Sequence, residues 1–165
     1  MLKKIVLFAL VLFTTGAFAQ EKIAHINAGE VITAMPEYTQ MQDSLQKTQS
    51  AIEAELKGME EEYNKKYTAL MEEGDKLIES IKIRRMQEIK DIEERAQNYQ
   101  RESQSQLQQL QQLLFAPVQQ KFKSAVEAIG EENGFTYIMD VSTILYVNPK
   151  SVDATPLVKK KLGLK

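Results

Sequence analysis

The longest pattern in the chain is a helical one that runs from Glu37 to Pro117. Apolar and small polar side chains recur there at steps of three and four residues, which places them in one stripe along a helix. In the first half, the stripe consists of Leu45, Thr48, Ile52, Leu56, Met59, Tyr63, Tyr67 and Leu70. After Ile81 it resumes with Met86, Ile89, Ile92, Ala96, Tyr99, Ser103, Leu107, Leu110, Leu114 and Val118. A helix with so narrow a stripe cannot bury itself in a globular core, so it must pair with another helix.

The midpoint of this segment falls near Lys76, next to Gly74 and Asp75. Glycine readily allows a helix to end or bend, so the pattern predicts a helical hairpin with its tip near residues 74–84. Each arm would be about 60 Å long at the rise of an α-helix. The eleven-residue spacing of the first arm is typical of a nearly straight or slightly right-handed pair.

Short elements flank the hairpin on both sides. Residues 22–27 read as a strand, and Asn27 followed by Glu30 predicts a capped short helix that stops at Met35-Pro36. After the hairpin, Ala116-Pro117 predicts a joint, beyond which the helical pattern resumes and ends at Gly134.

Residues 135–141 and 144–147 read as two strands of a β-hairpin. Thr155 then caps a last helix that begins with Pro156 and reaches Leu162. The expected fold is α+β and mostly α. A helical hairpin over residues 37–116 projects from a small body formed by residues 20–36 and 117–165.

The predicted three-stranded sheet has open edges and little apolar area, so it is expected to oligomerise. The residues predicted for this oligomerisation sheet are Ile23, Ile26, Tyr137, Ile138, Leu145 and Val147.

The first residues are typical of a secretory signal peptide. Lys3 and Lys4 precede an apolar run from Ile5 to Phe13, and Ala17-Phe18-Ala19 provides a cleavage site after Ala19. Loss of residues 1–19 removes two lysines and leaves 19 basic against 23 acidic residues, a net charge of −4. This balance gives no general attraction to nucleic acid, and the absence of cysteine excludes a disulfide framework. An exported product is expected.

The order of these short motifs around one long hairpin resembles the Skp/OmpH family of periplasmic chaperones. The matching motifs are Lys22-Ile-Ala-His-Ile-Asn27, Met35-Pro-Glu-Tyr38, Gly134-Phe-Thr-Tyr-Ile-Met-Asp140, Ile144-Leu-Tyr146 and Asp153-Ala-Thr155. The resemblance implies a homotrimer whose sheets form a central β-body. Three helical tentacles would then hold unfolded outer-membrane proteins between them without ATP.

Methionine and tyrosine side chains on the hairpin suit promiscuous binding of such clients. The predicted client-binding residues are Met59, Tyr63, Tyr67, Met71, Met86 and Tyr99. At this spacing, the same side chains are also what a helix-pairing core requires, so both interpretations stand.

Charge adds a second expectation for the tip. From Lys76 to Lys90 the net charge is +3, whereas from Glu53 to Asp75 it is −5. The basic residues of the tip are Lys76, Lys82, Arg84, Arg85 and Lys90. This cluster is suited to acidic client loops or to transient contact with anionic lipid, and a solvated helix face is the alternative.

Nothing in the sequence predicts catalysis, a cofactor or a metal site. His25 is the one histidine, adjacent acidic residues fall on different sides of a helix, and the glycines form no phosphate-binding loop. Two non-catalytic functions therefore remain: a holding chaperone, or a coiled-coil spacer or adaptor of the cell envelope. A thin seam without surplus exposed apolar residues would favour the spacer.

Overall fold

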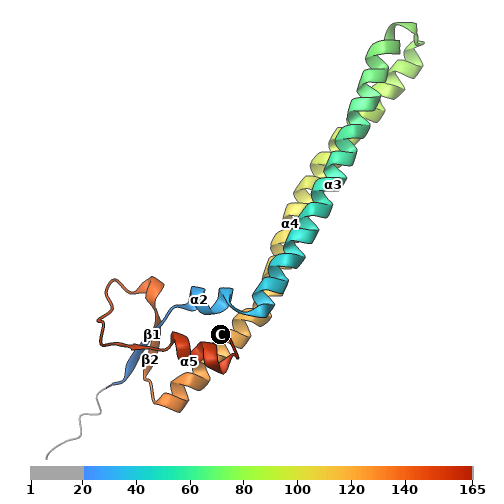
Figure 1. Ribbon diagram of the computed structural model, residues 1–165. Helices are drawn as coiled ribbons and strands as arrows, with labels where there is room; N and C mark the ends of the chain where they lie inside the picture. Colours follow the sequence, from blue (N-terminus) through green and yellow to red (C-terminus); the bar gives the residue numbers. More distant parts are fainter. Residues whose placement is uncertain (1–20, 165) are drawn as a thin grey trace, which may run out of the picture.

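The computed structural model describes residues 21–164 as a long helical rod attached to a small α+β body (Figure 1). The predicted signal peptide lies outside the described residues. In chain order the body begins with strand β1 (Ile23–Ile26) and helix α2 (Ala28–Thr33). The rod consists of helix α3 (Pro36–Glu73) and helix α4 (Glu79–Asn133). Strand β2 (Tyr137–Asp140), strand β3 (Val152–Asp153) and helix α5 (Thr155–Lys161) complete the body.

The predicted hairpin is confirmed, and its arms are antiparallel. Ion pairs between the arms run from Glu37 with Lys121 at the root to Glu73 with Arg85 at the tip. Pro36 begins α3, where its missing N–H leaves no hydrogen bond unmade. Helix α4 has 55 residues against 38 in α3, so it continues beyond the rod and forms part of the body.

The chain reverses at the tip as predicted, but Gly74 does not produce the reversal as expected. Gly74 keeps a right-handed helical conformation with φ −53°, and residues 74–76 make one 3-10 turn. The chain reverses because Leu77 and Ile78 are extended, with ψ of 143° and 148°. The conformational freedom of glycine is therefore not used here.

Pro117 lies inside α4 and does not interrupt it, so the expected joint at Ala116-Pro117 is not a break in the helix. A proline in this position leaves the carbonyl of Leu113 without its helical partner. The helix ends where predicted, because Gly134 adopts the left-handed conformation with φ 65° that a C-terminal cap requires.

The sheet has the order β2-β1-β3, and both strand pairs are parallel. The predicted antiparallel hairpin between 135–141 and 144–147 is therefore wrong. Residues 144–147, which include Leu145 and Val147, form no strand in the described chain. The segment has strand-forming side chains, but Val141–Thr143 form a 3-10 turn after β2, and the chain does not return to pair with the free edge of β2.

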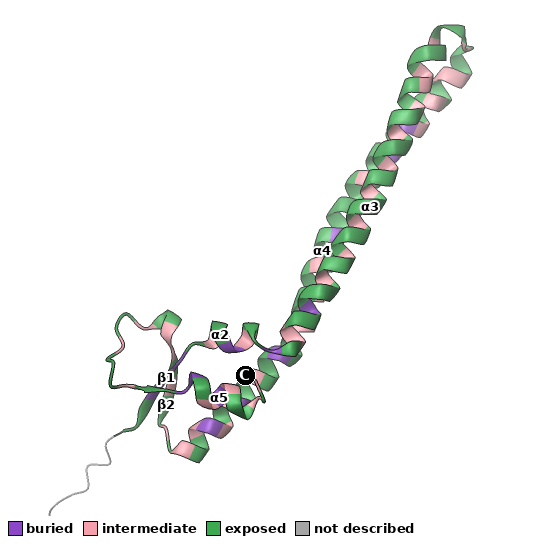
Figure 2. Cartoon of the chain, viewed as in Figure 1, coloured by how far each residue is buried: buried purple, intermediate pink, exposed green. Residues whose placement is uncertain are grey.

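The body has a closed core at which distant segments meet. Its buried centre consists of Ile26, Val31, Ala125, Ile129 and Val158. Figure 2 shows buried residues gathered in the body and spaced out along the rod.

Two polar contacts fix the start of the body. Asn27 Oδ1 accepts a hydrogen bond from the Glu30 N–H at 3.1 Å, which confirms the predicted cap of α2. Thr155 does not cap the last helix as expected. Its Oγ1 instead accepts a hydrogen bond from the Asn27 N–H at 3.0 Å and ties α5 to β1.

Candidate functional site: an apolar groove at the hairpin tip

The seam between α3 and α4 opens near the tip into a groove of about 490 Å³, which we call the tip groove. The two arms contribute similar apolar side chains to it because both stripes continue to the turn. The apolar lining consists of Tyr63, Tyr67, Leu70, Met71, Met86 and Ile89. Charged side chains of both signs complete the lining, namely Asp75, Lys82, Lys90 and Glu93.

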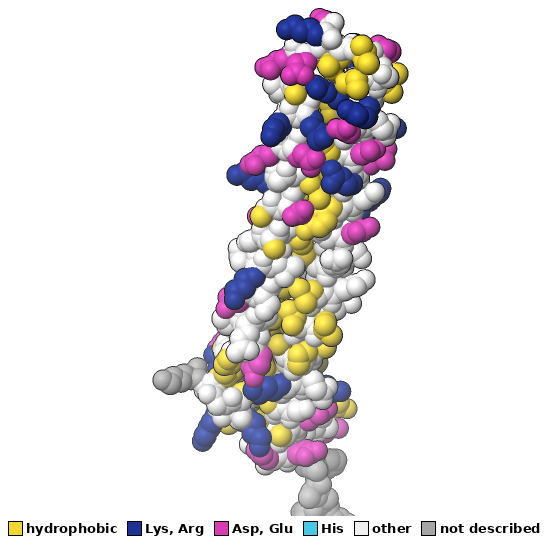
Figure 3. Space-filling model, turned by 90° about the vertical axis from the view of Figure 1, so that its right-hand side faces the viewer, with side chains coloured by type: hydrophobic (Ala, Val, Ile, Leu, Met, Phe, Trp, Pro, Cys, Tyr) yellow, Lys and Arg dark blue, Asp and Glu magenta, His cyan; other side chains and the backbone are white. Residues whose placement is uncertain are grey.

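A second, smaller groove continues the first toward the root. It has a volume of about 270 Å³ and shares Tyr63 and Glu93 with the tip groove. Leu56, Met59 and Ile92 add apolar surface to it. Figure 3 shows the resulting stripe of apolar side chains along the rod, with a denser cluster at the tip.

Tyr63 and Tyr67 stack in the tip groove, with ring centroids 5.8 Å apart and planes at 10°. They are one helical turn apart, so their rings meet on the same side of α3. Partial burial between the arms raises the pKa of the Tyr63 phenol, and the nearby Glu93 carboxylate raises it further. The phenol therefore stays neutral, and the pair offers an aromatic surface with polar ends.

Several large side chains around the tip remain exposed although they are apolar. Tyr67, Met71 and Met86 are the exposed members of the groove lining, and Ile78 and Ile83 add to them at the turn and on α4. Farther from the turn, the seam is closed by Ile89 and Ile92, which are both buried.

The other side of the seam is polar. Lys66 Nζ donates to Glu88 at 2.7 Å, and Arg85 donates to Glu73 at 2.8 Å. The Lys66 hydrogen bond is the main reason that the pKa of Glu88 lies below its ordinary value. The tip thus has one apolar side and one ion-paired side, since helical spacing separates residues 66, 73, 85 and 88 from those of the groove.

The structure brings together most of the predicted client-binding residues. Tyr63, Tyr67, Met71 and Met86 line the tip groove, and Met59 lines the adjoining one. Tyr99 is half-buried in the seam closer to the root and lines neither groove.

The predicted basic tip is divided between the two sides. Lys82 and Lys90 line the tip groove, whereas Arg85 pairs with Glu73 and Arg84 lies 3.7 Å from Glu88. Lys76 is in the turn, exposed. Part of the excess positive charge is therefore neutralised within the hairpin.

Sequence reasoning missed Leu70 and Ile89 as lining residues of the tip groove, and Ile78 and Ile83 as exposed apolar residues near the turn. Leu70 and Ile89 belong to the stripe and were assigned to pairing alone. Ile78 and Ile83 stand outside the stripe, and an apolar residue that pairing does not require is the signal that would have revealed them.

The residues predicted for the oligomerisation sheet separate into two groups. Ile26 and Ile138 pack toward the core of the body, whereas Ile23 and Tyr137 are exposed on the outer face of the sheet beside Met139. Leu145 and Val147 belong to the irregular loop between β2 and β3, and Leu145 is fully exposed.

The single histidine has a structural position. His25 Nδ1 lies 3.1 Å from Ser151 Oγ, and His25 Nε2 lies 4.0 Å from Asp153, so the ring joins β1 to the start and end of β3. Desolvation alone would raise the pKa of Asp153, but hydrogen bonds from Thr155 and the charge of His25 lower it. Neither the tip groove nor the adjoining groove includes any of these three residues.

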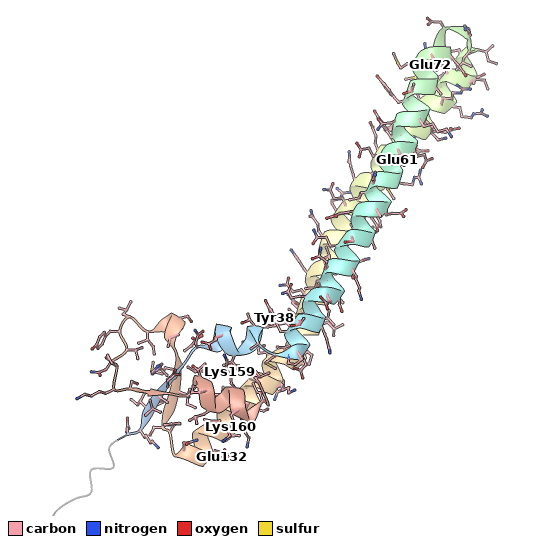
Figure 4. The ribbon with its side chains drawn as sticks, viewed as in Figure 1. Tyr38, Glu61, Glu72, Glu132, Lys159 and Lys160 are labelled. Atoms are coloured by element: carbon pink, nitrogen blue, oxygen red, sulfur yellow. The ribbon has the colours of Figure 1, made fainter. Side chains whose placement is uncertain are left out.

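Within residues 21–164, no three acidic or histidine side chains come close enough to hold a metal ion. Each helix over the same range is too short or too polar to cross a bilayer. Figure 4 shows charged side chains along the whole rod, with Glu61 and Glu72 on α3, and Glu132, Lys159 and Lys160 grouped where α4 meets α5.

Fold and site define a non-globular protein, in which a small parallel sheet carries a helical hairpin with an apolar groove near its tip. The sequence matches the family model "Outer membrane protein (OmpH-like)" over residues 22–162. The chain belongs to this OmpH-like family.

Comparison with solved structures agrees with this assignment. A crystal structure from Caulobacter crescentus CB15, named "putative outer membrane chaperone (OmpH-like)", superposes with a TM-score of 0.77. The match covers 86% of this chain and 83% of the other, at 13% sequence identity, so it shows the shared fold. Comparison with curated proteins gives no significant match.

Proposed function

We propose that this protein is an ATP-independent holding chaperone of the periplasm that binds unfolded outer-membrane β-barrel proteins and prevents their aggregation. The observation that carries the proposal is the exposed apolar lining of the tip groove. Unfolded barrel strands alternate apolar and polar side chains and tend to pair edge to edge. A groove with flexible Met side chains and aromatic rings provides contacts that adapt to many such segments.

The exposed tip favours this function over an envelope spacer. A spacer needs only the side chains that hold its two helices together, and the buried Ile89 and Ile92 already do this near the tip. Met71, Ile78 and Ile83 lie outside that seam and expose large apolar surfaces. Such a surface on a rod is typical of a site for another chain.

Assembly into a homotrimer is part of the proposal. The outer face of the sheet exposes Ile23, Tyr137 and Met139, and β2 and β3 each have one edge without a partner strand in the described chain. Apolar groups and open edges of this kind are stabilised when another copy covers them. The three-fold number comes from the family resemblance.

The loop after β2 supports the same assembly. Residues 144–147 have strand-forming side chains, yet Leu145 and Tyr146 point into solvent in a single chain. Near the root, a groove of about 790 Å³ lined by Ile26, Phe122, Val126 and Ile138 is also uncovered. In a closed ring, the protruding loop of one copy would meet a different surface of the next copy.

The proposed location of the protein is the periplasm, through which its clients pass. The predicted signal peptide would direct export and be cleaved after Ala19. Transient contact of the tip with anionic lipid belongs to the proposal as well. Lys76 and Lys82 are the basic residues suited to it, since Arg84 and Arg85 lie beside acidic partners on the ion-paired side.

The test uses the chain from Gln20 onward. Its mass is measured by light scattering, and a urea-unfolded outer-membrane barrel protein is then diluted into it without nucleotide. We expect a trimer that keeps the client in a soluble complex. A stable oligomer that leaves the client to aggregate would instead favour the spacer.

A paired substitution locates the binding surface. Tyr67→Ser with Met71→Ser removes two exposed side chains of the tip groove and should weaken client retention. Leu113→Ser is the matched control, because Leu113 is equally exposed on α4 but lies outside both grooves. Equal loss in both variants would contradict a site at the tip.

A further inference from the structure

Two thioethers line the tip groove, one from each arm. Met71 is the last apolar residue of α3 before the turn, and Met86 lies in the second turn of α4. Their side chains are 67% and 53% exposed, whereas Met35 and Met41 in the body and root are 1% and 4% exposed. The sequence therefore places its two most accessible described methionines in one binding surface.

Exposure controls how readily a methionine is oxidised. A peroxide transfers one oxygen atom to the thioether sulfur, and the peroxide leaves as water. The sulfur gains the oxygen and is oxidised by two electrons, while the peroxide is reduced by the same two electrons. The product, a sulfoxide, replaces a polarizable apolar group with a strong dipole.

We propose that Met71 and Met86 form an oxidation site, and that hydrogen peroxide in the envelope reduces client binding by converting both to sulfoxides. The regulatory part of this inference rests on the proposed holding function. Each sulfoxide would bring a hydrogen-bond acceptor into the groove, and an apolar client segment could cover it only by removing its water. Affinity for apolar segments should fall while the fold stays intact.

The structure explains why the hairpin survives this chemistry. The seam next to the groove is closed by Ile89 and Ile92, which contain no sulfur and are buried. Met35 and Met41, which do pack in the interior, are shielded from solvent. Oxidation therefore changes the groove and leaves the contacts between the two arms in place.

Met139 provides an internal reference. It is 46% exposed, similar to Met86, but it lies on the outer face of the sheet and far from the tip. Oxidation at Met139 should add a dipole to the body surface and leave the groove unchanged. Met139→Leu is thus the matched control for substitutions in the groove.

The first measurement is site selectivity. The chain from residue 20 onward is treated with limiting hydrogen peroxide, and peptides are mapped by mass spectrometry over time. Met71 and Met86 should gain one oxygen before Met59 and well before Met35 and Met41. Oxidation of the buried methionines first, or of all methionines together, would overturn the site.

The second measurement is client retention. Oxidised protein should hold an unfolded barrel protein about tenfold more weakly, with an unchanged helical circular-dichroism spectrum. Met71→Leu with Met86→Leu conserves volume and removes both sulfur atoms, so its own client affinity, measured before treatment, should not change after exposure to peroxide. Met139→Leu should remain sensitive, and methionine sulfoxide reductases should restore binding to the original chain.

Outcomes separate the two proposals. Full client retention after oxidation of both Met71 and Met86 would overturn the regulatory role while leaving the holding function intact. Unoxidised protein that fails to retain any client would overturn the holding function and, with it, the regulatory role. The mass-mapping result concerns only the chemistry of the two sulfur atoms and is interpretable in either case.

Discussion

The body and the rod use apolar residues in opposite ways. In the body, Val31 of α2 and Val158 of α5 are more than 120 residues apart in the chain. Both are completely buried in the same core. In the rod, a long antiparallel pair buries few side chains and leaves Met71, Ile78 and Ile83 in water. The body uses its apolar surface to fix one structure, whereas the rod keeps part of its surface available.

This difference predicts where a substitution destroys the fold and where it changes only a surface. The largest effect is expected from Val158→Asp, which places an unpaired charge in the core of the body. It should destabilise the protein by more than about 4 kcal/mol and abolish assembly. Urea unfolding followed by circular dichroism would measure it.

Val152→Asp is the control for that change, because Val152 is exposed on the short strand β3. The same substitution should alter stability there by less than about 1 kcal/mol. Similar losses at both positions would mean that the body does not depend on the closed core described above.

Ile92→Ala tests the seam of the rod. Ile92 is buried between the arms, so its truncation should cost about 2–4 kcal/mol locally and speed amide hydrogen exchange near the tip. Exchange in the body should not change, since the two regions share no contact at this level. Ile83→Ala on the exposed surface of the same helix should leave exchange unaltered.

Asn27→Ala removes the side-chain cap of α2, between the first strand and the first helix of the body. Loss of the hydrogen bond from the Glu30 N–H should lower the free energy of unfolding by about 1 kcal/mol. Thermal unfolding would detect it, with Asn64→Ala on the exposed surface of α3 as the comparison. A cap that contributes nothing would give equal melting temperatures for both variants.

The smallest effect concerns pH at the ion-paired side of the tip. The hydrogen bond from Lys66 holds the pKa of Glu88 below its ordinary value of 4.5. A carboxylate with a lowered folded-state pKa stabilises the fold above that ordinary value, and the contribution disappears as the pH falls through the lowered pKa. Because the pair is exposed, the change in stability should be small.

Lys66→Met sharpens this measurement. An NMR titration of the Glu88 carboxyl should show its pKa rising toward the ordinary value when the Lys66 ammonium is absent. Lys57→Met is a suitable control, because Lys57 pairs with Glu61 and does not touch Glu88. An unshifted Glu88 in the Lys66 variant would contradict the assignment of the main cause.

The rod was predictable from the sequence because its contacts are local and periodic. The stripe that includes Ile52, Ile89 and Ile92 fixes which side of each helix faces the other, and Pro36 and Gly134 mark the ends. The position of the turn was predicted correctly, but its conformation was not. Leu77 and Ile78 adopt extended backbone conformations, and the presence of glycine at position 74 does not predict this.

The sheet was harder to predict because pairing between strands is non-local. Residues 137–140 and 144–147 have similar strand-forming side chains, and a short separation favours a hairpin. Two residues, Val152 and Asp153, take the place beside β1 instead, and the Ala154 N–H donates to the His25 carbonyl at 2.8 Å. Such a short strand carries no recognisable pattern of its own.

Only part of the candidate site was predicted from the sequence. Periodicity identified Tyr63 and Tyr67, and side-chain type identified Met71 and Met86. Neither signal distinguishes a stripe residue that closes the seam from one that lines a groove. That difference depends on how far the helices separate near the turn. The volume of the groove follows from that separation.

The central position of β1 has a consequence for the order in which the chain matures. β1 pairs with Tyr137–Asp140 and with Val152–Asp153, so the beginning of the described chain is anchored by its end. During synthesis, the two arms can pair as soon as the second has emerged, because their contacts are local, whereas the body must wait for the last helix. A chain cut short before residue 152 would therefore present a formed groove on an unfinished base. The sheet can therefore be completed only after Val152 and Asp153 have been synthesised.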